Sequence, residues 1–447
     1  MNIKHIAVIA AISCAVIGAY AEGYQINTLS ARQNGMGHTG TALHLGSESM
    51  IFNPAGMAGM KDNIDFSGSV TAIFPHVSAD YEGVNYPTSN GASTPMAFNL
   101  AMKVYRNLAA GVSFYTPYGS AINWGENWPG AVLNQKVNLK VFTVQPTLSW
   151  EIIPGLSVGA GAMVSWGTVD LYKGLVSSQS VNALLAATGN PYRFSDTPAS
   201  VNLRGKAAVT VGVNVGIMWD INSKITVGAS FRQKMKMKVK SGDASVTYAN
   251  DVARGILMEQ LDLINQANFE AEMPAPAILN LGVAYKPVGR LTLAFDAQWT
   301  FWSAYKNLDI HFLSNHLRPF DQHLRKDYRN SWTFHLGAQY ALTKRFDLRA
   351  GLMVDTTPVR IDCFNPETPG MTKISPSVGF SFYPLKNFSI DAALLYVAGL
   401  GRDGASCSYN DLLLQFQGLP ESVYSKTFTA DYHVHAWNPS IGVTLRF

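Results

Sequence analysis

The chain has 447 residues, of which 47% are apolar and 14% are charged, and its formal net charge is +4. Soluble proteins carry roughly 25% charged residues, so this chain is poor in charge. The small positive balance, with no basic stripe, argues against a nucleic-acid partner. Beyond the N-terminus no apolar run approaches the roughly 20 residues that a membrane-spanning helix needs, which argues against a helical membrane protein.

The first 21 residues predict an export signal. Lys4 and His5 precede an apolar stretch over residues 6–17, and residues 19–21 (Ala-Tyr-Ala) supply a small-x-small cleavage site. Two alternatives remain: a membrane anchor, for which the run is short, and a lipoprotein signal at Cys14, whose preceding Ala-Ile-Ser departs from the usual motif.

Residues 22–60 show no alternation and are rich in Gly and small residues. From residue 63 onward, apolar and polar residues alternate in segments typical of β-strands with one dry face. In "KAAVTVGVNVGIMW", Val209, Val211, Val213 and every second residue after them are apolar. We count about 14 such segments, near residues 63–76, 96–105, 108–116, 137–152, 156–170, 203–220, 224–240, 277–286, 290–303, 331–341, 346–356, 374–384, 388–398 and 431–447.

The connections between these segments alternate between short turns and long loops. This asymmetry, an even strand count and a C-terminal Phe447 are typical of an antiparallel bacterial outer-membrane barrel. Lipid would cover the dry faces, and pairing of the last strand with the first would leave no open edge. A soluble β-sandwich would give the same alternation and is the rival. We therefore expect an all-β fold, a 14-stranded antiparallel transmembrane β-barrel over residues 61–447.

Two long loops contain helical patterns, near residues 180–188 and 250–269. In the second, Leu257, Leu261 and Ile264 fall on one face at helical spacing. This face either packs onto the barrel rim or forms an exposed apolar groove that captures a hydrophobic ligand.

A barrel of 14 strands encloses a lumen too wide for side chains alone to fill, since about eight strands is near that limit. We therefore expect residues 22–60 to fold inward as a plug; an open pore is the alternative.

At this point the chain resembles the outer-membrane long-chain fatty acid transporter family, which includes aromatic hydrocarbon channels. The stretches "GYQINTLSARQNGMG" and "NPAGMAG" are similar to the family's N-terminal hatch, and "YTPYGSAINW" is similar to the segment after its third strand. Further likeness lies in "EMPAPAILNLGVAYKP", "DAQWTFWSAYKNL" and "YRNSWTFHLGAQYALTKRFDLRAGLMVDTTPV". The resemblance spans nearly the whole mature chain, but the loops differ, so the choice of ligand does not carry over.

The resemblance implies a barrel plugged by the hatch, with ligand leaving sideways through a wall gap at a kinked third strand. Asn53, Pro54 and Ala55 match the family's most recognisable hatch tripeptide and are expected to act in gating. The kink is expected at Pro117, Tyr118 and Gly119, because proline cannot donate to the ladder and glycine tolerates unusual dihedrals. An ordinary strand end is the alternative.

A fatty-acid carboxylate in an apolar lumen needs a cation or N–H donors. By strand parity Arg232, Arg349 and Arg446 point inward, as do the acidic residues Asp296 and Asp391 and the imidazole of His335. Arg349 is the preferred head-group ligand and Arg232 the second. The alternative is a network of paired charges that rigidifies the barrel.

Cys363 and Cys407 fall in successive long loops, and we predict that they form a disulfide at the outer mouth. No nucleophile elbow, metal-binding His spacing or nucleotide-binding loop is recognisable, so we expect no enzyme activity, no metal and no cofactor.

The sequence thus predicts passive uptake of hydrophobic small molecules, with long-chain fatty acids as the leading candidate, across the bacterial outer membrane. Capture at the outer loops, binding in an apolar lumen, hatch rearrangement and lateral exit near the third strand would be its steps. The alternatives are an aromatic hydrocarbon channel and a surface adhesin or structural barrel. Expected partners are the ligand, outer-membrane lipid and lipopolysaccharide, and the barrel assembly machinery through Phe447. The protein is expected to be a monomer.

Overall fold

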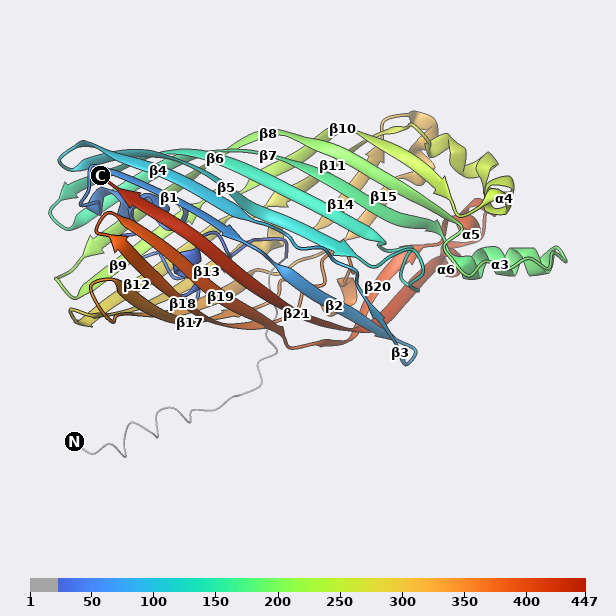
Figure 1. Ribbon diagram of the computed structural model, residues 1–447. Coiled ribbons are helices and arrows are strands. Elements are labelled where there is room, and N and C mark those ends of the chain that lie inside the picture. Colours follow the sequence, from blue (N-terminus) through green and yellow to red (C-terminus); the bar gives the residue numbers. More distant parts are fainter. Residues whose placement is uncertain (1–22) are drawn as a thin grey trace.

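The computed structural model describes residues 23–447, so the predicted export signal lies outside the described residues. Fourteen antiparallel strands form a closed ring, which confirms the predicted fold class and strand count (Figure 1). In ring order the strands are β1 (Ile64–Thr71), β4 (Met96–Tyr105), β5 (Leu108–Asn123), β6 (Lys136–Ile153), β7 (Leu156–Val176), β8 (Ala199–Asp220), β9 (Ile225–Arg232), β12 (Ile278–Val288), β13 (Leu291–Thr300), β16 (Ser331–Ala341), β17 (Phe346–Asp355), β18 (Lys373–Leu385), β19 (Phe388–Gly399) and β21 (Ser425–Arg446).

The first and the last strand of the wall close the ring. Strand β21 pairs with β1 from Asp65–Arg446 to Thr71–Ser440, and it pairs with β19 on its other side. The backbone of Phe447 exchanges hydrogen bonds of 2.8 and 2.9 Å with Ile64. The alternation at the C-terminus therefore belongs to the strand that seals the barrel.

The regions predicted as long loops are more ordered than expected. They carry seven further strands, which extend the wall at the end remote from the C-terminus (Figure 1). These are β2 (Phe74–Tyr81), β3 (Val84–Pro87), β10 (Met235–Tyr248), β11 (Asn268–Ala275), β14 (Asn307–Phe312), β15 (Gln322–Arg325) and β20 (Arg402–Asn410). Their outward residues are mostly polar, and six of the seven have nine residues or fewer, so each gives only a short stretch of alternation in the sequence.

Helices occupy the same end of the molecule. They are α3 (Ser178–Ala187), α4 (Asp251–Leu261), α5 (Leu412–Phe416) and α6 (Glu421–Tyr424), with short 3-10 turns η5 (Asp262–Ile264), η6 (Trp302–Ala304), η7 (Asn315–Phe320) and η8 (Ile361–Cys363). None of the helices within residues 23–447 has the length and apolar character that crossing a membrane requires.

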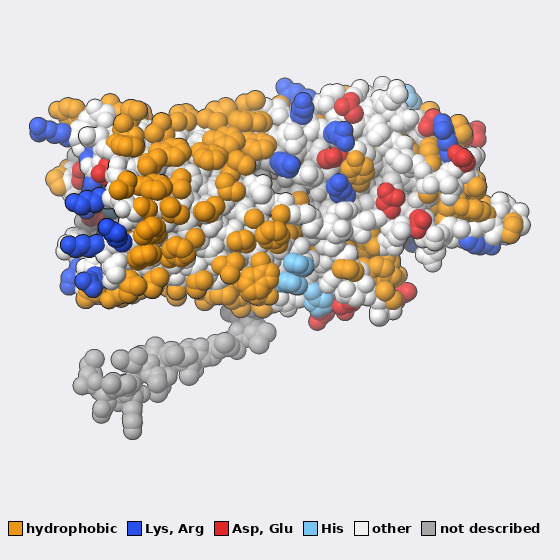
Figure 2. All heavy atoms as spheres, viewed as in Figure 1, with side chains coloured by type: hydrophobic (Ala, Val, Ile, Leu, Met, Phe, Trp, Pro, Cys, Tyr) orange, Lys and Arg blue, Asp and Glu red, His pale blue; other side chains and the backbone are white. Residues whose placement is uncertain are grey.

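The outer surface carries an apolar band over the half of the barrel that contains the C-terminus (Figure 2). Val209, Val211 and Leu148 are 67%, 64% and 58% exposed there. Monomeric soluble proteins rarely expose apolar patches of more than a few hundred Å². A band of this extent is what hydrocarbon covers in a membrane barrel.

Residues 24–60 lie inside the ring and are called the inner segment below. They form α1 (Ala31–Asn34), η3 (Gly46–Glu48), α2 (Ser49–Phe52) and η4 (Pro54–Gly59), and nearly all of them are buried. The segment lies directly against the wall where strands carry glycine: a Cβ on Gly351 would be 2.0 Å from the amide nitrogen of Gly37. Side chains at such positions would push the inner segment away from the wall.

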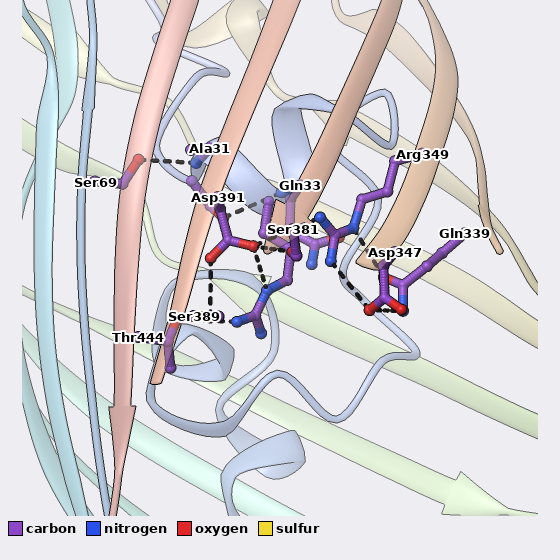
Figure 3. Close-up of polar contacts among 12 residues, drawn as sticks. Ala31, Gln33, Ser69, Gln339, Asp347, Arg349, Ser381, Ser389, Asp391 and Thr444 are labelled. Atoms are coloured by element: carbon purple, nitrogen blue, oxygen red, sulfur yellow. Dashed lines mark hydrogen bonds and ion pairs between the residues drawn. The ribbon is translucent and has the colours of Figure 1, made fainter. Parts of the chain in front are cut away.

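A buried charge network ties α1 to the wall (Figure 3). Arg32 and Arg349 both approach Oδ1 of Asp391, at 3.6 and 3.5 Å. Arg32 also donates to Oγ1 of Thr444 (2.9 Å), while Arg349 donates to Oε1 of Gln339 (2.8 Å). Arg349 has a second partner in Asp347, whose Oδ2 lies 3.8 Å from Nη2. Since ions in a low-dielectric interior are costly unless paired, Asp391 matters most as the carboxylate that approaches both guanidiniums.

A second anchor lies near the short-turn rim. Nε2 of His44, in the inner segment, is 3.0 Å from Oδ2 of Asp220 at the end of β8, and Nδ1 is 3.3 Å from the carbonyl oxygen of Gly56. Burial lowers the pKa of His44, but the hydrogen bond and charge of Asp220 outweigh burial, so the pKa lies above its ordinary value of 6.5.

We expect Asp391→Asn to destabilise the protein strongly, because it leaves Arg32 and Arg349 buried with less compensating charge. Breaking a buried ion pair typically costs about 3–5 kcal/mol. Urea unfolding in lipid vesicles, followed by tryptophan fluorescence, measures the free energy of unfolding. Asp403→Asn, at an exposed position, is the matched control. Equal stabilities of the two variants would contradict this role of Asp391.

The His44–Asp220 contact should make stability depend on pH. Because the folded pKa of His44 is raised, its contribution is fully present below pH 6.5 and is lost as the pH rises through the raised pKa. Thermal unfolding of the wild type and of His44→Gln should therefore differ at acidic pH and converge in alkali. His316→Gln, in an outer loop, is the control. A constant difference between pH 5 and 9 would exclude this linkage.

Candidate ligand path

A cavity of about 400 Å³, lined by both charged and apolar side chains, opens among the long loops. Its lining includes Lys173, Asp321, His323, Arg325 and Asp411. Most of these side chains come from the strand extensions and helices at the long-loop end. We call this space the mouth cavity.

Lys173 is the buried cation of the mouth cavity. It lies on β7, on the inward face between Leu171 and Leu175, and is 9% exposed. Its Nζ donates to Oε1 of Gln322 at 3.1 Å. The charge of Glu367 acts on it, but within residues 23–447 no carboxylate lies at ion-pairing distance from its Nζ. A buried ammonium without a carboxylate partner is costly, and an anionic ligand would relieve that cost.

Below the mouth cavity lies an apolar cavity of about 100 Å³. Its lining includes Val141, Leu171, Leu203, Phe269, Tyr305 and Leu308. Leu203 lines both spaces, so the two cavities adjoin. In this apolar cavity, a hydrocarbon tail that enters from the mouth cavity would contact side chains of β6, β7, β8, β11 and β14.

Groups that the sequence did not reveal surround this apolar cavity. Lys326 and Glu367, both from outer loops, form a buried ion pair. Burial lowers the pKa of Lys326, but the charge of Glu367 outweighs it, and the pKa is raised. Tyr24 packs edge-on against Trp302, with ring centroids 4.8 Å apart. No local motif marks these residues, because they meet only through the closure of distant loops.

The barrel wall has a discontinuity at β5. Pairing with β4 ends at Ala97–Tyr115, and the ladder with β6 shifts register between Tyr115 and Tyr118. The strand continues to Asn123, so Pro117, Tyr118 and Gly119 are not an ordinary strand end. The bulge lies where the sequence predicts a kink, whereas lateral opening there stays a prediction.

The inner segment seals this discontinuity. Ile26 donates its amide to the carbonyl of Pro117 (3.0 Å), and Gly119 donates to the carbonyl of Tyr24 (2.9 Å). Residues 24–26 thus occupy the edge of β5 that β4 leaves unpaired. Beside them lies a wall cavity of about 610 Å³. Ser120, Val137, Leu139 and Val141 line both this wall cavity and the apolar cavity.

The Asn53-Pro54-Ala55 tripeptide holds the inner segment in register. Nδ2 of Asn53 donates to the carbonyls of Thr41 (2.8 Å) and Ile217 (3.0 Å), and Oδ1 accepts from the amide of Ala55 (3.1 Å). A Cβ on Gly216 would be 2.0 Å from that Oδ1, so this wall position has room only for glycine. Gating by the tripeptide stays a prediction.

The two predicted head-group arginines lie in different surroundings. Arg232 lines a small cavity of about 40 Å³ and donates from Nη2 to the carbonyl of Ile51 (3.0 Å). Arg349 belongs to the Asp391 network and lines neither the mouth cavity, the apolar cavity nor the wall cavity. The structure therefore brings Arg232 to a cavity wall and places Arg349 away from the mouth, apolar and wall cavities.

The predicted loop groove is packed against the barrel. Leu257 and Leu261 on α4 and Ile264 on η5 are each at most 2% exposed and join the main apolar cluster. Only Ile264 also lines the mouth cavity. This is the rim-packing alternative for the two leucines.

Cys363 and Cys407 are free thiols that both line the mouth cavity. The amide of Phe364 donates to the carbonyl of Ser406 (3.0 Å), so their segments are neighbours. The predicted disulfide is not formed here and stays a prediction. Among the described residues, no group of three or more His, Cys, Asp or Glu side chains is placed to hold a metal.

Comparison with curated proteins finds distant relatives along most of the chain. Outer membrane protein P1 of Haemophilus influenzae is 23% identical over 415 residues, covering 86% of this chain and 87% of that protein. The long-chain fatty acid transport protein of Escherichia coli O6:H1 is 22% identical over 402 residues, covering 85% and 88%.

Solved structures share the architecture. A FadL homologue of Pseudomonas aeruginosa matches with a TM-score of 0.77 at 19% identity, covering 95% of this chain and 100% of that one. The toluene transporter TodX of Pseudomonas putida matches with a TM-score of 0.68 at 17% identity, covering 94% and 98%. At these identities the likeness concerns the fold.

The family comparison is broader than any single relative. The model of the outer membrane protein transport family (OMPP1/FadL/TodX) matches residues 12–447. This match covers the whole ring and the inner segment, and it agrees with the resemblance found in the sequence. The chain is therefore a member of the OMPP1/FadL/TodX family of outer membrane transport proteins.

Proposed function

We propose that the protein carries long-chain fatty acids passively across the outer membrane. The observation that carries this proposal is the continuous series of mouth, apolar and wall cavities, which adjoin through shared lining residues. Burying a methylene group contributes about 0.8 kcal/mol, so even a few carbons in the apolar cavity supply substantial affinity. A relative from Escherichia coli bears the name of such a transporter.

Capture begins at the mouth cavity. The carboxylate of the ligand pairs with Lys173, whose ammonium has no carboxylate partner within the described chain, while the tail enters past Leu203. The buried Lys326–Glu367 pair lies deeper, against the apolar cavity. Arg232 would bind a ligand carboxylate that reaches the inner segment. Arg349 could bind one only after it releases Asp391 and Gln339.

Release requires a second state with lower affinity, because a ligand shifts a conformational equilibrium only through its different affinities for the two states. The inner segment acts as the hatch that supplies this state. When residues 24–26 leave the edge of β5, the wall cavity opens toward the lipid beside Pro117, Tyr118 and Gly119. Asn53, Pro54 and Ala55 keep the remainder of the hatch attached to β8 during this movement.

An aromatic hydrocarbon is the second candidate ligand. The apolar cavity offers almost no polar surface, and a solved neighbour of this fold is named a toluene transporter. A hydrocarbon has no carboxylate head group, so only the fatty acid would depend on Lys173 for binding.

Other features complete the proposal. The protein works as a monomer and has no enzyme activity. The barrel assembly machinery recognises it through Phe447, and its outer wall contacts membrane lipid and lipopolysaccharide.

Replacing Lys173 by methionine should slow fatty-acid uptake and spare toluene uptake. Loss of one charge-assisted contact weakens binding about tenfold. Initial rates of labelled oleate and toluene entry into proteoliposomes below saturation measure this effect. Lys344→Met, at the opposite rim, is the control. Equal loss for both ligands would contradict a head-group role, and unchanged oleate uptake would reject capture at Lys173.

Locking the inner segment to β5 should stop uptake reversibly. Gln25 and Tyr118 are paired residues, so Gln25→Cys with Tyr118→Cys, in a background with Cys363→Ser and Cys407→Ser, offers a cross-link there. Oxidation is expected to abolish oleate uptake and reduction to restore it. The control pair Val70→Cys with Ile441→Cys cross-links neighbouring wall strands. Full uptake by the oxidised test pair would exclude opening at this place.

A further inference from the structure

Three exposed lysines lie side by side on the outer wall. Lys140 on β6, Lys206 on β8 and Lys240 on β10 alternate with inward residues such as Val141 and Val239. Thr168 on β7 pairs with Lys140 on one side and with Lys206 on the other. Val239 pairs with Ala207, and the register shifts beyond this pair, so Lys240 follows the last regular pair on β10 and lies near Lys206 on β8. The three ammonium groups thus form a row across four strands.

Three cations near this row are paired, whereas those of the row are not. Lys236 lies 2.8 Å from Glu272, Lys238 lies 3.1 Å from Glu270, and Arg204 lies 3.6 Å from Asp170. Across residues 23–447, Lys140, Lys206 and Lys240 have no carboxylate at ion-pairing distance. Like charges on neighbouring strands are destabilising. An uncompensated row therefore points to an anionic group supplied from outside the chain.

The row follows the long-loop edge of the apolar band. Two residues from Lys140, Phe142 pairs with Trp166, and Phe142 also stacks on Phe114 with ring centroids 6.0 Å apart. Three residues from Lys206, Val209 is 67% exposed. Figure 2 shows basic and acidic side chains gathered just beyond the apolar band on this face. Aromatic rings followed by cations are typical of a membrane–water interface.

We propose that Lys140, Lys206 and Lys240 bind the phosphate groups of a lipopolysaccharide head group in the outer leaflet. Phosphate is the anion at this depth, and each ammonium can contact one of its oxygens as a point charge. The hydroxyl of Thr168 lies between two of the cations and can donate to the same group. Acyl chains of that lipid would lie against Phe142, Trp166 and Val209. The proposal rests on the outer-membrane location, and not on which ligand is transported.

The position of this site relates it to the wall cavity. Lys140 also lines the outer margin of that cavity. A lipid held by the row would therefore lie beside the discontinuity of β5, where it would fill the space between barrel and neighbouring lipids.

The test uses the full-length protein in phosphatidylcholine nanodiscs and a labelled, bisphosphorylated lipid A as the probe. The variant Lys140→Gln/Lys206→Gln/Lys240→Gln should bind the probe roughly 100-fold more weakly than the wild type. The control Lys224→Gln/Lys344→Gln/Lys386→Gln removes the same charge from the opposite rim and should bind normally. Replacing the row by arginines should retain binding. Heat-modified mobility in detergent gels verifies that every variant folds.

Two further arms identify the source of the phosphate. Dephosphorylated lipid A should bind the wild type as weakly as the triple glutamine variant binds the intact probe, and millimolar inorganic phosphate should not displace the probe. Equal binding by the triple variant and its control would overturn the proposal. Displacement by free phosphate, or equal binding of the dephosphorylated lipid, would also overturn it. No transported ligand is present, so the outcome is independent of the uptake proposal.

Discussion

The structure depends on the requirement that every backbone amide and carbonyl in contact with hydrocarbon finds a partner within the chain. Lipid offers no hydrogen bonds, so an open sheet edge is excluded there. The closed ring meets this requirement by joining β21 to β1 at the two ends of the described wall. The place where wall strands part, at β5 beyond Tyr115, is met by residues 24–26 of the inner segment. The backbone of β5 therefore finds hydrogen-bond partners even where β4 no longer pairs with it.

The same requirement divides the side chains into two populations. Outward residues of the band are apolar because hydrocarbon surrounds them, whereas inward residues such as Ser381, Asp391 and Thr444 are polar and bond to one another or to α1 (Figure 3). The interior is therefore stabilised by a polar network that includes Arg32, Arg349 and Asp391, while the outer face is stabilised by the surrounding hydrocarbon. Above the band, the apolar cavity reverses this pattern, because Leu171 and Leu203 face inward there. A ligand that leaves the apolar cavity through the wall would pass directly into the hydrocarbon of the membrane.

The ring could be predicted from the sequence because alternation indicates which residues of a strand face hydrocarbon. This is a local property of each strand. Segments such as 209–219 carry that signal at every second position. Most of the strand extensions were missed because they are short: β14 alternates polar with apolar residues but has only six residues, and β15 has four.

The site was less predictable for a related reason. Parity placed Arg349 inward correctly, but its pairing with Asp391 depends on which strands the ring makes neighbours. Lys173 was not singled out, because its lack of a carboxylate partner is a property of the folded loops. Pro117 was recognisable since proline interrupts a ladder wherever it occurs, yet nothing local announces that Tyr24 and Ile26 complete the ladder there.

The pairing of residues 24–26 with β5 means that the segment inside the barrel also completes the hydrogen-bond ladder of its wall. In the proposed release step these residues leave β5 while Asn53 keeps the rest of the segment attached to β8. The equilibrium between the paired and unpaired states of so short a stretch would then set how often the wall opens, without a rearrangement of the whole inner segment.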